Sequence, residues 1–490
     1  MLGSVVVAIV IIVDARFASL TRRADLLLQH VSFSASLDHF NYNGLGTAPS
    51  FDPTRNSHCS LATMGEGSAR TPIANPNFDP TATGSVQSAL EHVDAALSTS
   101  ESTSGHINGL VSLHKVTPLI FSNVLSARTG QNIWLKLDAL QPSGSFKIRG
   151  VGRVCALAFE KYGSKAHLVT SSGGNAGLAA ATACKSLGLK CTVFVPGYTE
   201  AYVVALLRDG LQAEVVVGGD AWDACDKAAR RLVDKEKANG AVYVHPFVGE
   251  DLVDGHASLS QEIYQQMQET SPTTKADLII CTVGGGGMIQ GIMRGLSQIA
   301  KTDSSFCPPR LVATQDFGAD SFSQSMNMFF SDAQTNAEAH VTLPAITSKA
   351  TSMGAKRCSP DALRDARIYS QSGNASASIQ SQQAEPLSKD FPYLSTVIMD
   401  DALAGSATWQ FHRDHDLLVE ISCGAALAPI YFYERLLQPL VAKANLGRKA
   451  NIVVEVCGGS KIDLKTLEEY KQEYGEMEEK GRALLSGKEA

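Results

Sequence analysis

A lysine in an apolar setting is the first residue of this sequence that could do chemistry. Lys147 lies in the stretch QPSGSFKIRG (141–150), just after the apolar alternation NIWLKLDAL, and Phe146 and Ile148 flank it. A lysine at such a strand-to-helix turn is poorly solvated, and desolvation lowers its pKa and frees the amine as a nucleophile or base. The alternative is a solvated surface charge, as most lysines are.

Consecutive glycines form a second candidate element. The glycines in TVGGGGMIQG end a buried β-branched run and precede a helical pattern; they are Gly284, Gly285, Gly286 and Gly287. Successive N–H groups of such a loop can point at one anion, and the helix dipole adds partial positive charge. The loop has neither the spacing of a dinucleotide fingerprint nor the Lys-Ser/Thr of a P-loop, so it predicts another kind of phosphate site. The alternative is a tight turn without a ligand.

A third loop, TSSGGNAGLAAA, also joins an expected strand to an expected helix. Ser171 and Ser172 offer hydroxyl and N–H groups suited to a carboxylate, and Asn175 can both donate and accept. Serine and asparagine also cap many helices without binding a ligand. Taken together, a phosphate loop, a carboxylate loop and a desolvated lysine indicate a cofactor that carries both a phosphate and an aldehyde. Pyridoxal 5'-phosphate (PLP) fits that description.

Strands and helices alternate along the part of the chain that holds these loops. Strands are expected at NIWLKLDAL, AHLVTS, CTVFVPG, AEVVVGG, AVYVHPF, DLIICTV, RLVAT and NIVVEVCGG. Helices are expected at FKIRGVGRVCALAFEKYG, NAGLAAATACKSLG, AYVVALLRDG, AWDACDKAARRLVDKEKA, MIQGIMRGLSQIA and GAALAPIYFYERLLQPLV, with one charged helix after Asp463 that accounts for the end of the chain. Short apolar runs that alternate with helical patterns predict an α/β architecture with largely parallel sheets.

The bulk properties argue against several classes of partner. A chain of 490 residues is long enough for two or more domains, and a net charge of −7 without a basic block argues against a nucleic-acid partner. The apolar run 5–13 is too short to cross a bilayer, which needs about 20 residues, so no membrane partner is expected. The cysteines lack zinc spacing, which predicts a reduced, cytoplasmic compartment. The arginines that follow the apolar run leave a mitochondrial presequence as the alternative.

The sequence resembles the fold-type II PLP-dependent enzymes, and within them the L-serine/L-threonine dehydratases. The motifs LHKVTPL, QPSGSFKIRG, SSGGNAGLAAA, DGHASLSQEI, TVGGGGMIQG, FGADSF, LPAITS, VEISCGAALAPIY and VVEVCGGSKI match that family in the family's order. The resemblance covers about 112–468 and implies two α/β domains with open, twisted sheets and the cofactor in the cleft between them. The expected parts are an N-terminal extension (1–110), a large domain (111–138 and 247–475), a small domain (139–246), a polar surface insertion (369–390) and a C-terminal tail (476–490).

The resemblance also implies a role for each candidate residue. Lys147 is expected to form the Schiff base and to take the α-proton of the substrate, with Ser172 as the second catalytic residue. The substrate carboxylate is expected to bind Ser171, Ser172 and Asn175. The expected cofactor contacts are Phe146 beside the ring, Asn175 at the ring hydroxyl, Gly284, Gly285, Gly286 and Gly287 at the phosphate, Cys423 at the pyridine nitrogen, and Gly458 and Ser460 closing that side of the pocket.

A potassium site is a further implication of the resemblance. Its expected ligands are the carbonyl groups of Gly284, Ala319, Met353 and Ala355 and the hydroxyl of Ser321. Gln315, however, stands where many relatives have a glutamate near that site. Potassium is therefore a hypothesis that depends on whether the site tolerates the loss of a carboxylate.

The implied reaction is β-elimination of water from L-serine, and from L-threonine, to give pyruvate or 2-oxobutanoate and ammonia. The resemblance implies a homodimer. A role in amino-acid catabolism, supplying gluconeogenesis, is expected because too few residues follow CGGSKI for the regulatory domain of the biosynthetic threonine dehydratases. One alternative is a β-replacement enzyme like cysteine synthase or cystathionine β-synthase. Those typically have Asn-Thr-Gly and a threonine-rich phosphate loop where this sequence has NAG and GGGG. The other alternative is a PLP-binding protein without turnover.

Overall fold

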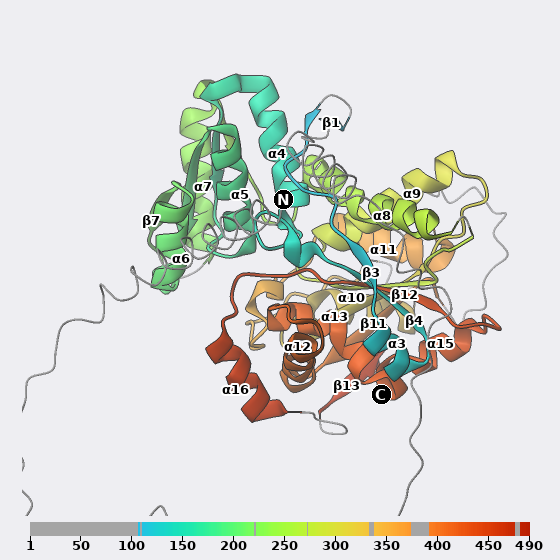
Figure 1. Ribbon diagram of the computed structural model, residues 1–490. Helices are drawn as coiled ribbons and strands as arrows, with labels where there is room; N and C mark the ends of the chain where they lie inside the picture. Colours follow the sequence, from blue (N-terminus) through green and yellow to red (C-terminus); the bar gives the residue numbers. More distant parts are fainter. Residues whose placement is uncertain are drawn as a thin grey trace, which may run out of the picture. The chain divides into compact units, whose positions relative to one another are not determined.

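A computed structural model gives the fold of the chain (Figure 1). It describes residues 106–107, 110–219, 222–271, 273–332, 338–373, 392–475 and 481–490. Nearly all of the predicted N-terminal extension and most of the predicted insertion lie outside these residues. The described residues all belong to one compact unit, Ser85–Ala490.

The larger of two main sheets has eight strands in the order β14-β13-β11-β10-β9-β12-β4-β3. The strands are β3 (Leu119–Phe121), β4 (Asn132–Lys136), β9 (Leu278–Thr282), β10 (Arg310–Asp316), β11 (Leu394–Met399), β12 (Asn451–Glu455), β13 (Ala483–Leu485) and β14 (Lys488–Glu489). The central strands from β11 to β4 pair in parallel, and antiparallel strands close both edges. Strand β9 is buried at every position, as expected of a parallel strand that is covered on both faces.

The smaller sheet has four strands in the order β7-β6-β5-β8, and all of its pairs are parallel. The strands are β5 (His167–Thr170), β6 (Lys190–Val195), β7 (Glu214–Val217) and β8 (Ala241–Tyr243). All of them fall within 139–246, the range expected for the small domain. A separate antiparallel pair joins β1 (His106–Ile107) to β2 (Leu110–Val111).

Helices connect the strands of both sheets. They are α3 (Asn123–Thr129), α4 (Lys147–Tyr162), α5 (Asn175–Leu187), α6 (Ala201–Ala205), α7 (Trp222–Glu236), α8 (Glu250–Thr270), α9 (Gly287–Thr302), α10 (Ser321–Ser331), α11 (Pro360–Ser372), α12 (Asp401–His415), α13 (Ile421–Tyr431), α14 (Tyr433–Leu436), α15 (Gln438–Ala444) and α16 (Leu464–Tyr474). Shorter helical turns are η1 (Asp138–Leu140), η2 (Gly163–Lys165), η3 (Leu206–Gly210), η4 (Lys237–Asn239) and η5 (Thr351–Met353). None of the helices in the described ranges is long and apolar enough to cross a membrane.

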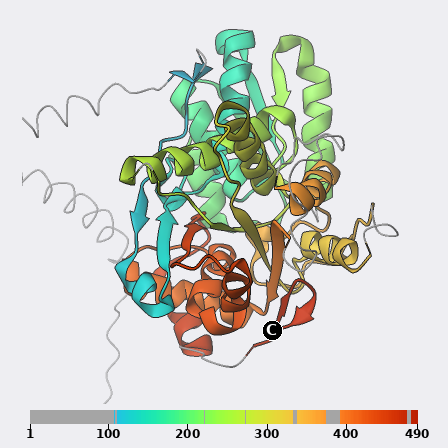
Figure 2. The same ribbon diagram turned by 90° about the vertical axis from the view of Figure 1, so that its right-hand side faces the viewer.

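Helices cover both faces of the larger sheet. Residues of α8 and α9 pack with Ile279 and Val453 on one face, and residues of α12 and α13 pack with Ile280 and Val454 on the other. Adjacent residues of a strand point to opposite faces, so these apolar pairs fill both cores. The two helix layers lie on opposite sides of the strands in Figure 1 and in the turned view of Figure 2. The predicted α/β class with parallel sheets is confirmed.

The end of the chain is not one charged helix, so that part of the prediction is wrong. Helix α16 ends at Tyr474, and Gly475 follows with a positive φ of 54°. Strands β13 and β14 then extend the larger sheet, with β13 antiparallel to β11. The predicted C-terminal tail (476–490) therefore contributes edge strands. Each is only two or three residues long, which is too short to leave a period-two pattern in the sequence.

Two further boundaries differ from the prediction. The single helix expected in GAALAPIYFYERLLQPLV is divided into α13, α14 and α15 by breaks at Phe432 and Leu437. Proline lacks the N–H that a helix interior needs, and Pro429 and Pro439 precede or follow those breaks. The predicted insertion begins within α11, where Tyr369 is fully buried. Its first residues are therefore part of the core and not of a surface loop.

A carboxyl group without a partner is buried at the end of β12. Glu455 is fully buried, and within the described part of the chain neither of its side-chain oxygens has a hydrogen-bond partner. Burial raises the pKa of Glu455 well above its usual value, and the nearby Cys457 adds to the shift. The folded state therefore favours the neutral acid.

We expect Glu455→Met to stabilise the protein more at pH 8 than at pH 5. The unfolded chain releases this proton above about pH 4.3, whereas the folded state retains it. The wild type therefore loses up to about 1.4 kcal/mol of stability per pH unit until the folded pKa is reached. Thermal unfolding of both proteins from pH 5 to pH 8 measures the difference. The exposed Glu160, changed to Gln, is the control. An identical pH dependence in wild type and Glu455→Met would contradict this account.

Candidate active site

Lys147 is the first residue of α4 and is half-buried. Its Nζ donates a hydrogen bond to the carbonyl oxygen of Pro246 at 2.8 Å and lies 5.0 Å from the centre of the Phe146 ring. Burial lowers the pKa of Lys147 from 10.5 to about 8. A much larger fraction of this amine is therefore neutral near pH 7 than for a solvated lysine. This is the desolvated amine that the sequence indicated.

The loop before Lys147 is bonded to the residues that follow β12. The N–H of Phe146 donates to the carbonyl oxygen of Cys457 at 3.1 Å, and the N–H of Gly459 donates to that of Gly144 at 2.9 Å. Gly458 has a φ of 78°, and a Cβ there would lie 2.4 Å from the Gly144 oxygen. Only glycine allows this approach, so Gly458 lies beside the lysine loop, while its place at the ring-nitrogen side of the pocket stays a prediction.

The glycine loop joins β9 to α9 and has no room for side chains. A Cβ on Gly285 would lie 2.2 Å from the Phe247 ring, and one on Gly287 would lie 2.7 Å from the Phe247 carbonyl oxygen. Gly286 has a φ of 95°, which glycine adopts without cost. Among the backbone hydrogen bonds of turns, loops and caps in the described ranges, none has the N–H of one of these four glycines as its donor. The loop can therefore offer N–H groups at a helix N-terminus to an anion.

Asn175 links the smaller sheet to the loop after β12. It is the first residue of α5, and its Oδ1 accepts hydrogen bonds from the N–H and the hydroxyl of Ser460 at 3.1 and 3.0 Å. Its Nδ2 donates to Oε1 of Glu420 at 3.0 Å, and the N–H of Lys461 donates to the same oxygen at 2.8 Å. The structure thus brings the predicted residues Asn175 and Ser460 together.

Glu420 was missed by the sequence reasoning. Its side chain is buried, and Gly459 takes a φ of 121° beside it, where a Cβ would lie 2.2 Å from the carboxyl carbon. The sequence shows only an acidic residue two positions before the run SCGAALA, which does not by itself indicate a contact with Asn175. A carboxylate that receives the Asn175 amide fixes which end of that amide faces Ser460.

The two serines of the third loop have different surroundings. The Ser171 hydroxyl is fully buried and donates to Oδ1 of Asp226 at 3.2 Å, with the Tyr243 hydroxyl 3.1 Å away. Ser172 is half-buried, and its hydroxyl accepts only a hydrogen bond from the N–H of Gly174 at 3.3 Å within the described residues. The Ser171 side chain is therefore hydrogen-bonded to residues packed around the smaller sheet, whereas the Ser172 side chain contacts only its own loop among the described residues.

Two buried thiols, Cys423 and Cys457, contact each other in the core beside the larger sheet. That contact and burial raise the pKa of the Cys457 thiol well above its usual value. Cys457 is also close enough to interact electrostatically with the Lys147 amine. The place of Cys423 at the pyridine nitrogen stays a prediction.

A buried ion cluster anchors α4 two residues after Lys147. The Arg149 guanidinium donates to Oδ2 of Asp138 at 2.5 Å and to Oε1 of Glu262 at 2.6 Å. Lys136 donates to Oε2 of Glu262 at 2.6 Å. Burial alone would raise the pKa of Glu262, but hydrogen bonds from Arg149 and His114 and the nearby positive charges lower it.

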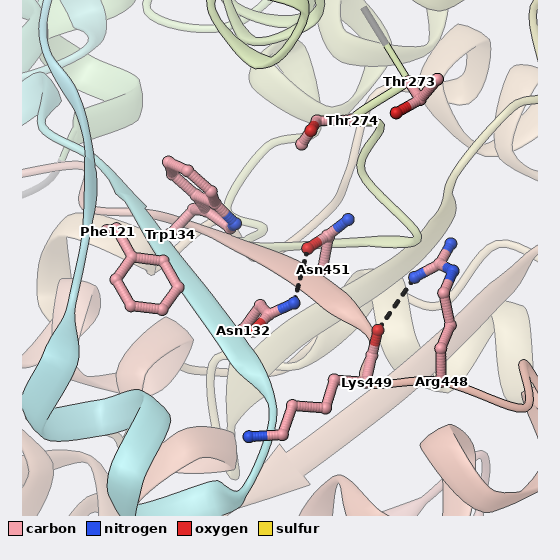
Figure 3. A pocket seen from close by; sticks show the side chains of 8 residues that line it. All are labelled: Phe121, Asn132, Trp134, Thr273, Thr274, Arg448, Lys449 and Asn451. Atoms are coloured by element: carbon pink, nitrogen blue, oxygen red, sulfur yellow. Dashed lines mark hydrogen bonds between the residues drawn. The ribbon is translucent and has the colours of Figure 1, made fainter. Parts of the chain in front are cut away.

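The hollow drawn in Figure 3 lies at the amino ends of β4 and β12 in the larger sheet. Asn132 and Asn451 line it and are the first residues of β4 and β12, where the Asn132 amide donates to the Asn451 oxygen at 3.0 Å. Lys147 and Cys457 follow the other ends of these two strands. This hollow is therefore separate from the candidate site.

Comparison with known proteins identifies the family. The family model described as "Pyridoxal-phosphate dependent enzyme" matches residues 111–458. The chain belongs to this family. It is 35% identical to the L-serine dehydratase/L-threonine deaminase of Bos taurus and 36% identical to that of Homo sapiens, in each case over 74% of this chain and 96% of the relative. The structure of a fungal L-serine ammonia-lyase from Rhizomucor miehei matches with a TM-score of 0.60 and 27% identity, over 74% of this chain and 99% of that one.

The residues of the site fit pyridoxal phosphate. The glycine loop excludes side chains and presents N–H groups suited to a phosphate, and Lys147 provides an amine of lowered pKa suited to an aldehyde. Phe146 lies beside that amine, as expected of the residue next to the ring. The cofactor of this family member is accordingly pyridoxal phosphate.

We expect borohydride to trap pyridoxal phosphate on Lys147 of the cofactor-free protein, at a rate that rises as the pH passes about 8. The rate follows the neutral fraction of the amine, and an ordinary lysine would show the same rise near pH 10.4. Peptide mapping of the reduced adduct from pH 6 to pH 10 measures both the position and the profile. Lys461, whose side chain lies near Gly174 in the same site, is the matched control as Lys461→Ala. Label on other lysines, or a rise only above pH 10, would refute the assignment.

Proposed function

We propose that this protein is an L-serine ammonia-lyase that also accepts L-threonine. The observation that carries the proposal is the convergence of a desolvated amine, a side-chain-free anion loop and a carboxylate loop. The glycine loop follows the parallel strand β9 of the larger sheet. The loop before Lys147 and the side chain of Asn175 both form hydrogen bonds with the residues that follow the parallel strand β12. The mammalian relatives, which match 74% of this chain, act on serine and threonine by their printed names, and the fungal one acts on serine.

The carboxylate loop holds the substrate. The Ser172 hydroxyl and the first N–H groups of α5 are donors at a helix N-terminus, where a carboxylate is favoured. Asn175 is held by Ser460 and Glu420, so its amide is oriented before any ligand arrives. The substrate is bound by dipoles and hydroxyls in this arrangement, which adds no positive charge beside Lys147.

Lys147 moves the proton. Pyridoxal phosphate, when bound, supplies an electron-withdrawing ring that stabilises negative charge at the substrate α-carbon. The neutral Lys147 amine takes the α-proton, and its bond to the Pro246 oxygen holds Nζ in one position until then. The β-hydroxyl leaves as water, and hydrolysis of the dehydrated product gives a 2-oxo acid and ammonia.

Cys423 is proposed as the thiol that faces the pyridine nitrogen, and Cys457 lies in contact with it. The raised pKa of Cys457 keeps that neighbouring thiol neutral. A neutral thiol, unlike a carboxylate, does not hold a positive charge on a ring nitrogen. Less charge at that position favours prompt elimination over a long-lived carbanion.

The wider setting of the protein is also a proposal. We infer a homodimer in the cytoplasm that works in amino-acid catabolism, with pyruvate as its product from serine. A reduced compartment agrees with the free cysteines of the described residues. The mitochondrion is the alternative location.

We expect the PLP-loaded protein to release pyruvate from L-serine and 2-oxobutanoate from L-threonine, with one ammonia for each 2-oxo acid. Lys147→Ala should lose at least about 1,000-fold in kcat, because proton transfer by a positioned base contributes about that much. Lys461→Ala should retain activity. A stable spectral shift without 2-oxo acid, followed by product only when a sulfur nucleophile is added, would instead support the β-replacement alternative. A bound cofactor with neither product would support the non-catalytic one.

The two serines provide a sharper test. Ser172→Ala should raise the KM for L-serine by roughly tenfold, because one hydrogen bond to a charged group is lost. Ser171→Ala should lower the melting temperature and leave KM within about twofold, since its hydroxyl bonds Asp226 and Tyr243 and not the loop. Steady-state kinetics and thermal unfolding of both variants measure this. The reverse pattern would show that Ser171 holds the substrate with its side chain.

A further inference from the structure

The groups expected to bind potassium gather between the ends of β9 and β10 and the turn η5. A Cβ on Gly284 would lie 3.1 Å from the Met353 carbonyl oxygen, so these two segments touch. The Ser321 hydroxyl donates to the carbonyl oxygen of Ala355 at 2.9 Å, and the N–H of Ala355 donates to that of Met353 at 2.8 Å. The expected ligands are therefore close together, but they already bond one another.

Gln315 bonds one member of this group, the Ala319 carbonyl oxygen. It lies in β10 and is fully buried. Its Nε2 donates to the carbonyl oxygens of Val283 at 2.6 Å and Ala319 at 2.9 Å. Its Oε1 accepts from the N–H of Ser323 at 2.8 Å. A backbone N–H can only donate, so this bond fixes the amide with its NH₂ group toward the two carbonyls.

The expected site does not fit potassium in this chain. Carbonyl oxygens bind potassium by replacing its hydration shell, and they must be open to the ion. A carbonyl oxygen keeps a second lone pair after it accepts one hydrogen bond, so the bonds to the Met353 and Ala355 oxygens do not by themselves exclude an ion. The decisive contact is the Gln315 NH₂ group, whose N–H points at the Ala319 oxygen, so a cation bound to that oxygen would meet positive partial charge.

We propose that the Gln315 side-chain amide replaces the monovalent cation. Its two N–H groups present partial positive charge to two carbonyl oxygens at hydrogen-bond distance, and its oxygen accepts from the N–H of Ser323. All the polar atoms of this side chain are thereby satisfied inside the protein, without an ion. The loop after β9 is tied to β10 through Val283, directly before the phosphate-binding glycines.

A glutamate at the same position would have the opposite requirement. An ionised carboxylate has only acceptors, so one of its oxygens would face the Val283 and Ala319 carbonyl oxygens without a proton between them. Like partial charges at that distance repel, and a cation placed among them removes the repulsion. Exchanging one NH₂ group for one oxygen should therefore create a demand for a cation.

Thermal unfolding of the PLP-loaded, full-length protein tests this. Wild type and Gln315→Glu are compared in potassium chloride, sodium chloride and tetramethylammonium chloride at equal ionic strength. We expect the melting temperatures of the wild type to agree within about 2 °C. Gln315→Glu should melt at least about 5 °C higher in potassium than in tetramethylammonium chloride, because an ion that binds only the folded state stabilises it. The ammonia-lyase rate should show the same pattern. The melting temperatures do not depend on turnover, so the inference and the proposed function can fail separately.

Gln410→Glu is the matched control, since Gln410 is also buried but lies in α12 and bonds Ser406. It should be destabilised equally in all three salts. A wild type that needs potassium for stability would overturn the proposal, as would a Gln315→Glu variant without a cation preference. If Gln315→Glu fails to fold in each of the three salts, the wild-type series decides. Equal wild-type melting temperatures support the proposal, and a potassium requirement refutes it.

Discussion

The buried pairing of Arg149 with two carboxylates is the interaction on which the site depends. Asp138 lies two residues after the end of β4, and Glu262 lies in α8. Arg149, in the first turn of α4, forms ion pairs with both. Losing one partner of such a pair costs about 3–5 kcal/mol, because it leaves an uncompensated buried charge. This cost holds the first turn of α4, and with it Lys147, at one place against the larger sheet. A lysine with four rotatable bonds could not be positioned by its own contacts alone.

Once α4 is fixed, parallel strands bring the rest of the site together. The carboxyl ends of parallel strands lie at one edge of a sheet, so the residues after β9 and β12 lie at the same edge, where Gly458 pairs with Ser145 just before α4. The smaller sheet adds α5 through the bond from Asn175 to Ser460. Glycine is needed where these segments cross, as at Gly458, because a side chain would displace the backbone beside it. The loops can therefore be short, and each presents backbone groups rather than long side chains.

The sequence was informative where local chemistry determines structure. The glycine loop and the loop of Asn175 follow apolar runs directly, and their backbone needs are visible in the residue types alone. Glu420 could not be found in this way, because its partner is 245 residues away and nothing near it in the chain indicates that contact. Cys423 and Cys457 are both buried, and only their packing distinguishes the one that affects Lys147. The edge strand β13 was invisible for a related reason, since three residues gain their structure from β11 and not from their own pattern.

Neutrality of the groups around Lys147 explains its chemistry. Burial lowers the pKa of His256, whose ring lies at a tilt 5.3 Å from that of Phe146, and raises that of Glu455 at the end of β12, so both favour their uncharged forms. The charges that do lie below the site are compensated within the Arg149 cluster. An uncompensated carboxylate beside Lys147 would raise the pKa of its amine and remove the neutral base. The chain therefore separates two tasks: a charged cluster positions the helix, and the neutral His256 beside Phe146 adds no negative charge that would raise the pKa of the lysine.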